Sequence, residues 1–150
     1  HKYFEGKVPA EGTRDELDRA MLAECQARQE SVASEIEAFH FKNALSEMMK
    51  LARAGNVYLD QKKPWSQRKE SIEACGTTIN VCLQVIRTLG VLMAPFLPDG
   101  ALKVAEMLRL GEGELAWERA LDRLPAAHPL GPAQILFRKL REETRGAAPA

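Results

Sequence analysis

The most chemically suggestive part of this sequence is the string K-K-P-W-S-Q-R-K at residues 62–69, in which cations flank a tryptophan. Lysines and arginines beside an exposed aromatic ring suit single-stranded nucleic acid, because the cations neutralise phosphates while the ring stacks on an unpaired base. The same pattern has a structural interpretation, in which Trp65 follows Pro64 at a corner between two helices and fills a gap in the core. From the residues alone, both interpretations stay open.

Residues that could carry catalysis or bind a metal are poorly arranged. The three histidines have no metal-ligand spacing among themselves or with the three cysteines. The sequence contains no glycine-rich phosphate loop, no G-x-S-x-G motif and no paired carboxylates in an apolar setting. An odd number of cysteines without a C-x-x-C motif fits a reducing compartment and argues against a disulfide framework. The pattern therefore favours a binding or scaffolding domain over an enzyme.

The charge of the chain is balanced overall but divided along the sequence. Twenty-one basic residues match twenty-one acidic ones, which excludes binding of nucleic acid by bulk charge. Residues 11–37 carry three basic and eight acidic side chains, a balance of −5, whereas residues 42–69 carry seven basic and two acidic side chains, a balance of +5. A local basic face is therefore compatible with a net charge of zero.

Length and hydropathy predict one helical domain spanning residues 1–150. Strand signals, such as alternating apolar and polar residues or Asn-Gly turns, are absent from the sequence. The most apolar stretch, residues 79–97, carries Gln84 and Arg87 and is broken by Pro95. This composition predicts a buried helix rather than a membrane span.

Apolar periodicity predicts a series of helices. A T-x-x-E capping box at Thr13 begins the first helix, and the second ends before Pro64, which forces Lys63 out of the α region. The inward residues expected in the second helix are Phe41, Leu45, Met48, Ala52 and Leu59. From Ile72 to Met93 the apolar residues have the three-and-four spacing of a coiled-coil seam. We expect this third helix to be central, with Ile86 fully buried.

The remainder of the chain is expected to hold a fourth helix from Pro98, a short helix at residues 115–124 and an amphipathic helix at residues 135–145. The predicted fold class is all-α. Its architecture is an antiparallel helix bundle with a C-terminal helical appendage.

Longer strings in the sequence resemble one family. K-Y-F-E-G-K-V-P opens the chain, A-L-S-E-M-M-K-L-A-R-A-G-N-V-Y-L-D-Q-K-K-P-W ends at Trp65, and T-T-I-N-V-C-L-Q-V-I-R-T-L-G-V-L-M-A-P-F-L-P follows. Together with the closing H-P-L-G-P-A-Q-I-L-F-R-K-L, they resemble the anticodon-binding domain of methionyl-tRNA synthetase over almost the whole chain. The family usually shows a Gly-His pair near the end, whereas Ala127 precedes His128 here.

The resemblance implies a bundle of the class I synthetase type that receives the anticodon stem-loop of tRNA-Met and recognises its CAU triplet. By this resemblance Trp65 stacks on an anticodon base and Pro64 sets its angle. Asn56 and Asp60, one helical turn apart, would line the pocket. Two further residues, Lys63 and Arg68, are expected as phosphate contacts on the basis of position only. The resemblance thus favours the stacking interpretation of the tryptophan over the structural one.

The resemblance also implies a longer parent protein, a methionine–tRNA ligase. The family's catalytic domain with its HIGH and KMSKS signatures, and its zinc-binding insertion, are not in the sequence. The family also uses an Asn and an Arg on a helix just before the K-Y-F segment, upstream of His1. We therefore expect no cofactor in this chain, with ATP and any zinc held by the catalytic domain, and no catalysis by the chain alone.

The partners expected from the resemblance are the tRNA-Met anticodon stem-loop and a catalytic domain in cis, in the cytoplasm, with no membrane and no DNA. The alternative is a stand-alone relative that uses the helical bundle as a protein-interaction module. Loss of the pocket residues would mark that alternative. Asn56, Asp60, Pro64 and Trp65 are all present, which favours RNA binding.

Overall fold

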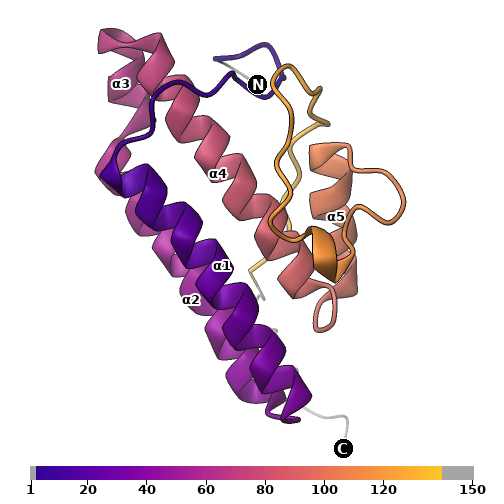
Figure 1. Ribbon diagram of the computed structural model, residues 1–150. Coiled ribbons are helices and arrows are strands. Elements are labelled where there is room, and N and C mark those ends of the chain that lie inside the picture. Colours follow the sequence, from indigo (N-terminus) through magenta and orange to yellow (C-terminus); the bar gives the residue numbers. More distant parts are fainter. Residues whose placement is uncertain (1–2, 140–150) are drawn as a thin grey trace, which may run out of the picture.

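The computed structural model describes residues 3–139, which fold into an all-α arrangement (Figure 1). Its helices are α1 (Glu16–Glu37), α2 (Phe41–Lys62), α3 (Pro64–Glu70), α4 (Ile72–Met93) and α5 (Pro98–Leu108), followed by a 3-10 turn, η1 (Trp117–Arg119). The first two helices form a long antiparallel hairpin, and α4 packs against both of them. The short α3 joins the hairpin to α4 at one end of the molecule (Figure 1). The predicted all-α class is confirmed.

α4 is the central helix, in contact with α1, α2, α3 and α5. Val81, Val85 and Leu92 lie in the main buried cluster, which α4 shares with the hairpin. Leu83 joins Val104 of α5 in a second cluster. By length and hydropathy α4 alone among the described helices could span a membrane, but 78% of its most apolar window is buried inside the bundle. Such burial is typical of a helix in the core of a folded domain.

The start of α1 differs from the prediction. The helix is capped by Asp15, whose side chain accepts the Asp18 N–H at 3.0 Å, while the Asp18 carboxylate accepts the Asp15 N–H at 2.9 Å. The capping box predicted at Thr13 is therefore wrong by two residues. Each of the two carboxylates accepts a hydrogen bond from the backbone N–H of the other residue. This caps the helix in the way that the predicted hydroxyl and glutamate would have done.

Some apolar residues predicted to be buried are exposed. On α2, Phe41 is 54% exposed and Leu45 is 37% exposed, because the helix packs against both α1 and α4 and its buried stripe points between them. That stripe carries residues outside the predicted set, such as Leu51 and Tyr58. On α4, Ile86 is 38% exposed, so the prediction of full burial is wrong.

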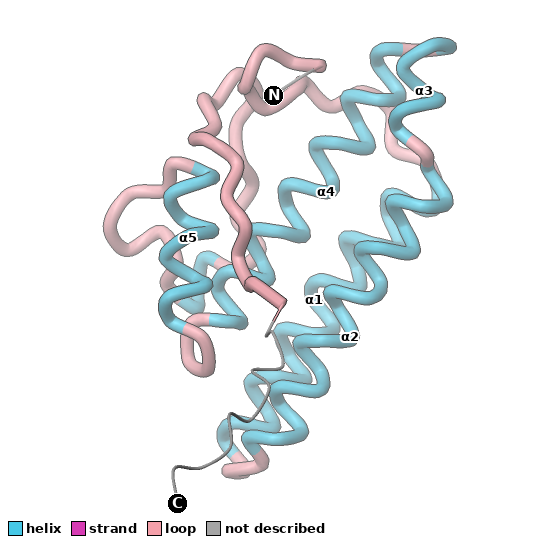
Figure 2. The backbone as a smooth tube through the Cα atoms, turned by 180° about the vertical axis from the view of Figure 1, so that it is seen from behind, coloured by secondary structure: helices cyan, strands magenta, loops and turns pink. Residues whose placement is uncertain are grey.

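The chain after α5 holds less helix than predicted. Only η1 forms within residues 115–124, and residues 135–139 are not helical; residues 140–145 lie outside the described part. Instead, residues 125–130 run beside the N-terminal segment, where the Val8 N–H donates to the His128 carbonyl at 2.9 Å. Prolines in this stretch lack the N–H that a helix needs. Figure 2 shows it as loop beside α5, so the predicted helical appendage is not found in the described residues.

Candidate functional site

The junction between α2 and α3 exposes Trp65. α2 ends at Lys62, and Lys63 adopts a left-handed conformation (φ 47°, ψ 64°) while its N–H donates to the Leu59 carbonyl at 2.9 Å. Proline disfavours the α region in the residue before it and suits the first position of a new helix. Pro64 is buried at that position, whereas Trp65 is 47% exposed. The structural interpretation requires Trp65 to fill a gap in the core, and its exposure does not fit that role.

α3 presents one face to α4 and another to solvent. The Thr78 hydroxyl of α4 donates to the Gln67 side-chain oxygen at 2.8 Å, so the side of α3 with Gln67 faces α4. Arg68 and Lys69, three and four residues after Trp65, share a different face with the indole. All three side chains are exposed. The predicted phosphate contact Arg68 thus lies beside the ring, and so does Lys69, which helical spacing could have identified from the sequence.

The two lysines of K-K-P-W face opposite ways. The Lys62 side chain is 6% exposed, and its Nζ lies 2.5 Å from Asp15 Oδ2 and 2.9 Å from Asp18 Oδ1. Lys63 is exposed, and no carboxylate within residues 3–139 lies within ion-pair distance of it. The Lys63 side chain is therefore exposed, whereas Lys62 is held in the interior.

An ionic cluster, formed by the buried side chains of Asp18, Tyr58 and Lys62 and the exposed carboxylate of Asp15, supports this junction. Asp18 is 1% exposed and accepts a hydrogen bond of 2.6 Å from the Tyr58 hydroxyl. Burial by itself lowers the pKa of Lys62, but bonds to the two aspartates raise it overall. Burial and the Asp18 carboxylate both raise the pKa of Tyr58, so the phenol stays protonated. The cluster ties the start of α1 to the last turns of α2.

Sequence reasoning missed this cluster. The sequence feature that could have revealed the cluster is the spacing of Tyr58 and Lys62. They are one helical turn apart, and both lie on the buried stripe of α2. A lysine in a basic string is ordinarily exposed, so the spacing alone did not suggest burial. The acidic partners lie 40 to 47 residues earlier in the chain.

The two remaining predicted residues, Asn56 and Asp60, are exposed and lie one turn apart on α2. Asn56 borders a cavity of about 170 Å³ between α2 and α4, whose other walls include Leu59, Val85 and Ile86. Asp60 is not among the residues that line this cavity; it lies in the last turn of α2, next to the α3 junction. Both side chains are thus exposed within the last two turns of α2, and Asp60 does not share the cavity that Asn56 borders.

The positive charge of residues 42–69 remains largely unneutralised. Lys50 pairs with Glu47, which also pairs with Arg28 of α1, and Lys62 pairs within the ionic cluster. No carboxylate within residues 3–139 lies within ion-pair distance of the other cations of this stretch, which are Lys42, Arg53, Lys63, Arg68 and Lys69. These five cations are all exposed, along α2, at its junction with α3 and on α3.

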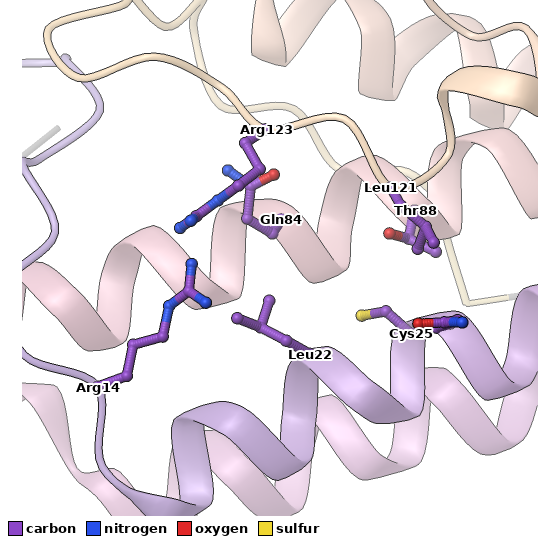
Figure 3. A pocket seen from close by; sticks show the side chains of 8 residues that line it. Arg14, Leu22, Cys25, Gln84, Thr88, Leu121 and Arg123 are labelled. Carbon is purple, nitrogen blue, oxygen red and sulfur yellow. The ribbon is translucent and has the colours of Figure 1, made fainter.

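A separate cavity of about 260 Å³ lies between α1, α4 and the loop that follows η1 (Figure 3). Its walls are formed by Arg14, Leu22, Cys25, Gln26, Gln84, Thr88, Leu121 and Arg123. Both arginines pair with Glu11, and burial raises the pKa of Cys25 to about 11. The two arginines share a single carboxylate, and the Cys25 thiol stays protonated at neutral pH, so the cavity carries no reactive thiolate. Within residues 3–139, no three potential metal ligands gather.

Comparison with known proteins identifies relatives over nearly the whole chain. The family model described as the anticodon binding domain of methionyl tRNA ligase matches residues 8–148. The methionine–tRNA ligase of Pyrococcus horikoshii is 43% identical over 143 residues, which are 95% of this chain and 19% of that protein. The methionine–tRNA ligase of Porphyromonas gingivalis is 36% identical over 144 residues, 95% of this chain and 21% of that protein. The chain thus spans about a fifth of the length of these curated relatives.

Solved structures have the same fold. The apo form of Mycobacterium tuberculosis methionyl-tRNA synthetase matches with a TM-score of 0.88 at 26% sequence identity, covering 93% of this chain and 29% of that chain. Its complex with methionyl-adenylate matches with a TM-score of 0.86. The helix bundle predicted from the sequence is therefore a known arrangement.

Proposed function

The chain belongs to the family of anticodon-binding domains of methionyl-tRNA ligase, and we propose that it binds the anticodon stem-loop of tRNA-Met and reads its CAU triplet. The observation that supports this most strongly is the 47% exposed ring of Trp65, flanked by Arg68 and Lys69 on the outer face of α3. An exposed aromatic ring stacks on an unpaired base while neighbouring cations hold phosphates. A tryptophan buried at a helix corner would have no such surface.

The other site residues take roles that follow from their chemistry. Pro64 is buried at the first position of α3 and sets the direction in which the Trp65 side chain projects from the bundle. Asn56 offers both amide donors and an acceptor to a base edge, while Asp60 accepts from exocyclic amino groups such as those of cytosine and adenine. Lys63 supplies a phosphate contact at the junction. Asn56 and Asp60 lie within the last two turns of α2, and Lys63 and Trp65 follow at its junction with α3.

We further propose that this chain is the recognition part of a longer methionine–tRNA ligase. The chain spans only about a fifth of its curated relatives, so the ATP-dependent joining of methionine to tRNA would take place in a catalytic domain in cis. That domain would hold the ATP and any zinc. Three free thiols suit a reducing compartment, which together with a tRNA ligand supports a cytoplasmic location.

Replacing Trp65 by alanine tests the stacking role. Fluorescence anisotropy would measure binding of a labelled CAU stem-loop and of the same stem-loop with a permuted triplet, and thermal melting would be recorded on the same samples. Stacking of a base on an aromatic side chain is worth about 1–3 kcal/mol, so affinity for the CAU loop should fall about 5- to 150-fold. Because the ring is half exposed, the melting temperature should change little.

The chain's other tryptophan provides a matched control. Trp117 packs against the main core, and its carbonyl accepts from the Gln29 amide at 3.0 Å. Trp117→Ala should lower the melting temperature and leave the preference for CAU unchanged. The proposal is wrong if Trp65→Ala destabilises the fold but keeps the CAU preference, or if the wild-type chain does not distinguish the two loops.

A further inference from the structure

The N-terminal segment, residues 3–12, is fixed in place along α4. The Gly12 N–H donates to the Thr77 hydroxyl at 2.9 Å, and the Asn80 amide donates to the Pro9 carbonyl at 3.0 Å. Gly76 lets the segment lie close to the helix, since a Cβ there would come within 3.3 Å of a backbone carbonyl oxygen of the segment. Figure 1 shows the segment crossing α4 before it enters α1. Side chains at its start therefore have a defined position beside α3.

The first described side chain of this segment, Tyr3, packs against Arg68. The guanidinium carbon lies 4.5 Å from the centroid of the Tyr3 ring, within the roughly 6 Å limit of a cation–π contact. No carboxylate within residues 3–139 lies within ion-pair distance of Arg68, so the ring is the partner that restrains its guanidinium. A guanidinium lying over an aromatic face keeps its N–H donors in its own plane, where they can bind an anion with two parallel bonds.

The position of Arg68 specifies which anion this would be. Arg68 is one helical turn from Trp65 on the exposed face of α3. In a nucleotide, one sugar separates the base from its phosphate, so a base stacked on the indole brings a phosphate close to the neighbouring guanidinium. The charge and the planar donors of Arg68 are complementary to that group.

We propose that Tyr3 is a positioning residue of the RNA site: its ring holds the Arg68 guanidinium in place to bind the backbone phosphate next to the base stacked on Trp65. This inference rests on the proposed anticodon-binding function. It extends the site to a segment of the chain that lies sixty residues before the K-K-P-W string and that sequence reasoning did not connect with it.

The experiment compares the salt dependence of stem-loop binding in four variants of the full chain: Arg68→Gln, Tyr3→Phe, Tyr3→Ala and the double variant Tyr3→Ala/Arg68→Gln. A lost phosphate contact lowers the slope of log K against log salt by about 0.7–0.9, which we expect for Arg68→Gln with CAU and permuted loops alike. Tyr3→Phe keeps the ring and should bind like the wild type. Tyr3→Ala should weaken binding about 2- to 5-fold, the range of an exposed cation–π contact.

The double variant and a charge control separate positioning from other roles. If Tyr3 acts through Arg68, then Tyr3→Ala should cause no further loss in the Arg68→Gln background. Arg109→Gln removes the same charge from an exposed arginine at the end of α5 and should leave the salt slope unchanged. Melting temperatures of all variants would be measured in parallel.

Three results would overturn the proposal. If Tyr3→Ala lowers the melting temperature but leaves binding and the salt slope intact, the contact only anchors the N-terminal segment. If Tyr3→Ala costs as much affinity in the Arg68→Gln background as in the wild type, the ring contacts RNA directly. If binding depends on Trp65 but Arg68→Gln leaves the slope unchanged, this inference alone fails. A wild-type chain that does not distinguish the loops refutes the proposed function as well.

Discussion

Lys62 and Lys63 are adjacent in the sequence, yet their replacement by alanine should have very different effects on stability. The Nζ of Lys62 contacts two carboxylates, those of Asp15 and Asp18, and its side chain is only 6% exposed. The side chain of Lys63 is exposed. We expect Lys62→Ala to destabilise the fold strongly and Lys63→Ala to change the free energy of unfolding by less than about 0.5 kcal/mol.

The size of the Lys62 effect follows from what the substitution leaves behind. Removing one member of a buried ion pair costs about 3–5 kcal/mol, because the partner charge stays buried without compensation. Asp18 would keep its bonds from the Tyr58 hydroxyl at 2.6 Å and from the Asp15 N–H at 2.9 Å, so we expect the lower end, about 3 kcal/mol. For a chain of this size, that loss lowers the melting temperature by about 6–12 °C.

The pH dependence of stability gives a second readout of the same cluster. Burial tends to raise the pKa of Asp15, but the hydrogen bond from Lys62 lowers it overall, to below its ordinary value of 3.8. A carboxylate with a lowered folded pKa stabilises the fold above its unfolded pKa and loses that contribution as the pH falls through the folded value. The raised pKa of Lys62 means that its contribution is lost as the pH rises above 10.5. The stability gap between wild type and Lys62→Ala should therefore narrow below pH 3.8 and above pH 10.5.

Urea unfolding and thermal melting of the two alanine variants would test this reasoning, with Asp18→Asn and the double variant Lys62→Ala/Asp18→Asn measured beside them. The asparagine removes the charge that Lys62→Ala leaves unpaired, so the double variant should be more stable than the sum of the single losses by about 1–3 kcal/mol. Equal losses for Lys62→Ala and Lys63→Ala, or a loss under about 1 kcal/mol for the former, would show that the cluster does not stabilise the junction.

Three further outcomes are expected. Leu92→Ala, at a fully buried position, should cost about 2–5 kcal/mol in urea unfolding, whereas Ile86→Ala should cost less than about 2 kcal/mol; similar losses would contradict the exposure of Ile86. Burial raises the pKa of Cys25 and Cys82 to about 11, so a thiol reagent at neutral pH should label the native protein slowly. After unfolding without reductant, the reagent should count three free thiols. A count of one would indicate a disulfide. The isolated chain should show no methionine-dependent ATP–pyrophosphate exchange, and exchange by a pure sample would refute the assignment of catalysis to another domain.

The fold class and the bounds of the central helix could be predicted from the sequence, because both depend on local signals. The apolar spacing predicts a helix from Ile72 to Met93, which is the extent of α4. Pro64 ends α2 through its effect on Lys63, a contact between neighbours in the chain. The strings around Trp65 also identified the family, since they keep its residues in order.

Which face of each helix is buried could not be predicted from spacing alone. Phe41 and Ile86 fit the apolar pattern, yet both are exposed: Phe41 is the first residue of α2, and Ile86 borders the cavity between α2 and α4. Leu51 and Tyr58 lie on the stripe of α2 that the packing of α1 and α4 selects. Periodicity shows that a helix has an apolar side, but the neighbouring helices set the direction in which it points.

The site shows the same division between local and distant causes. The tryptophan, its proline and the cations around them were visible in the sequence, but the burial of Lys62 and the contact between Tyr3 and Arg68 were not. Both depend on residues far away along the chain: Asp15 and Asp18 draw Lys62 inward, and Tyr3 lies against Arg68. Sequence chemistry supplied the groups, and the tertiary structure decided their partners, because burial and charge pairing are properties of three-dimensional proximity.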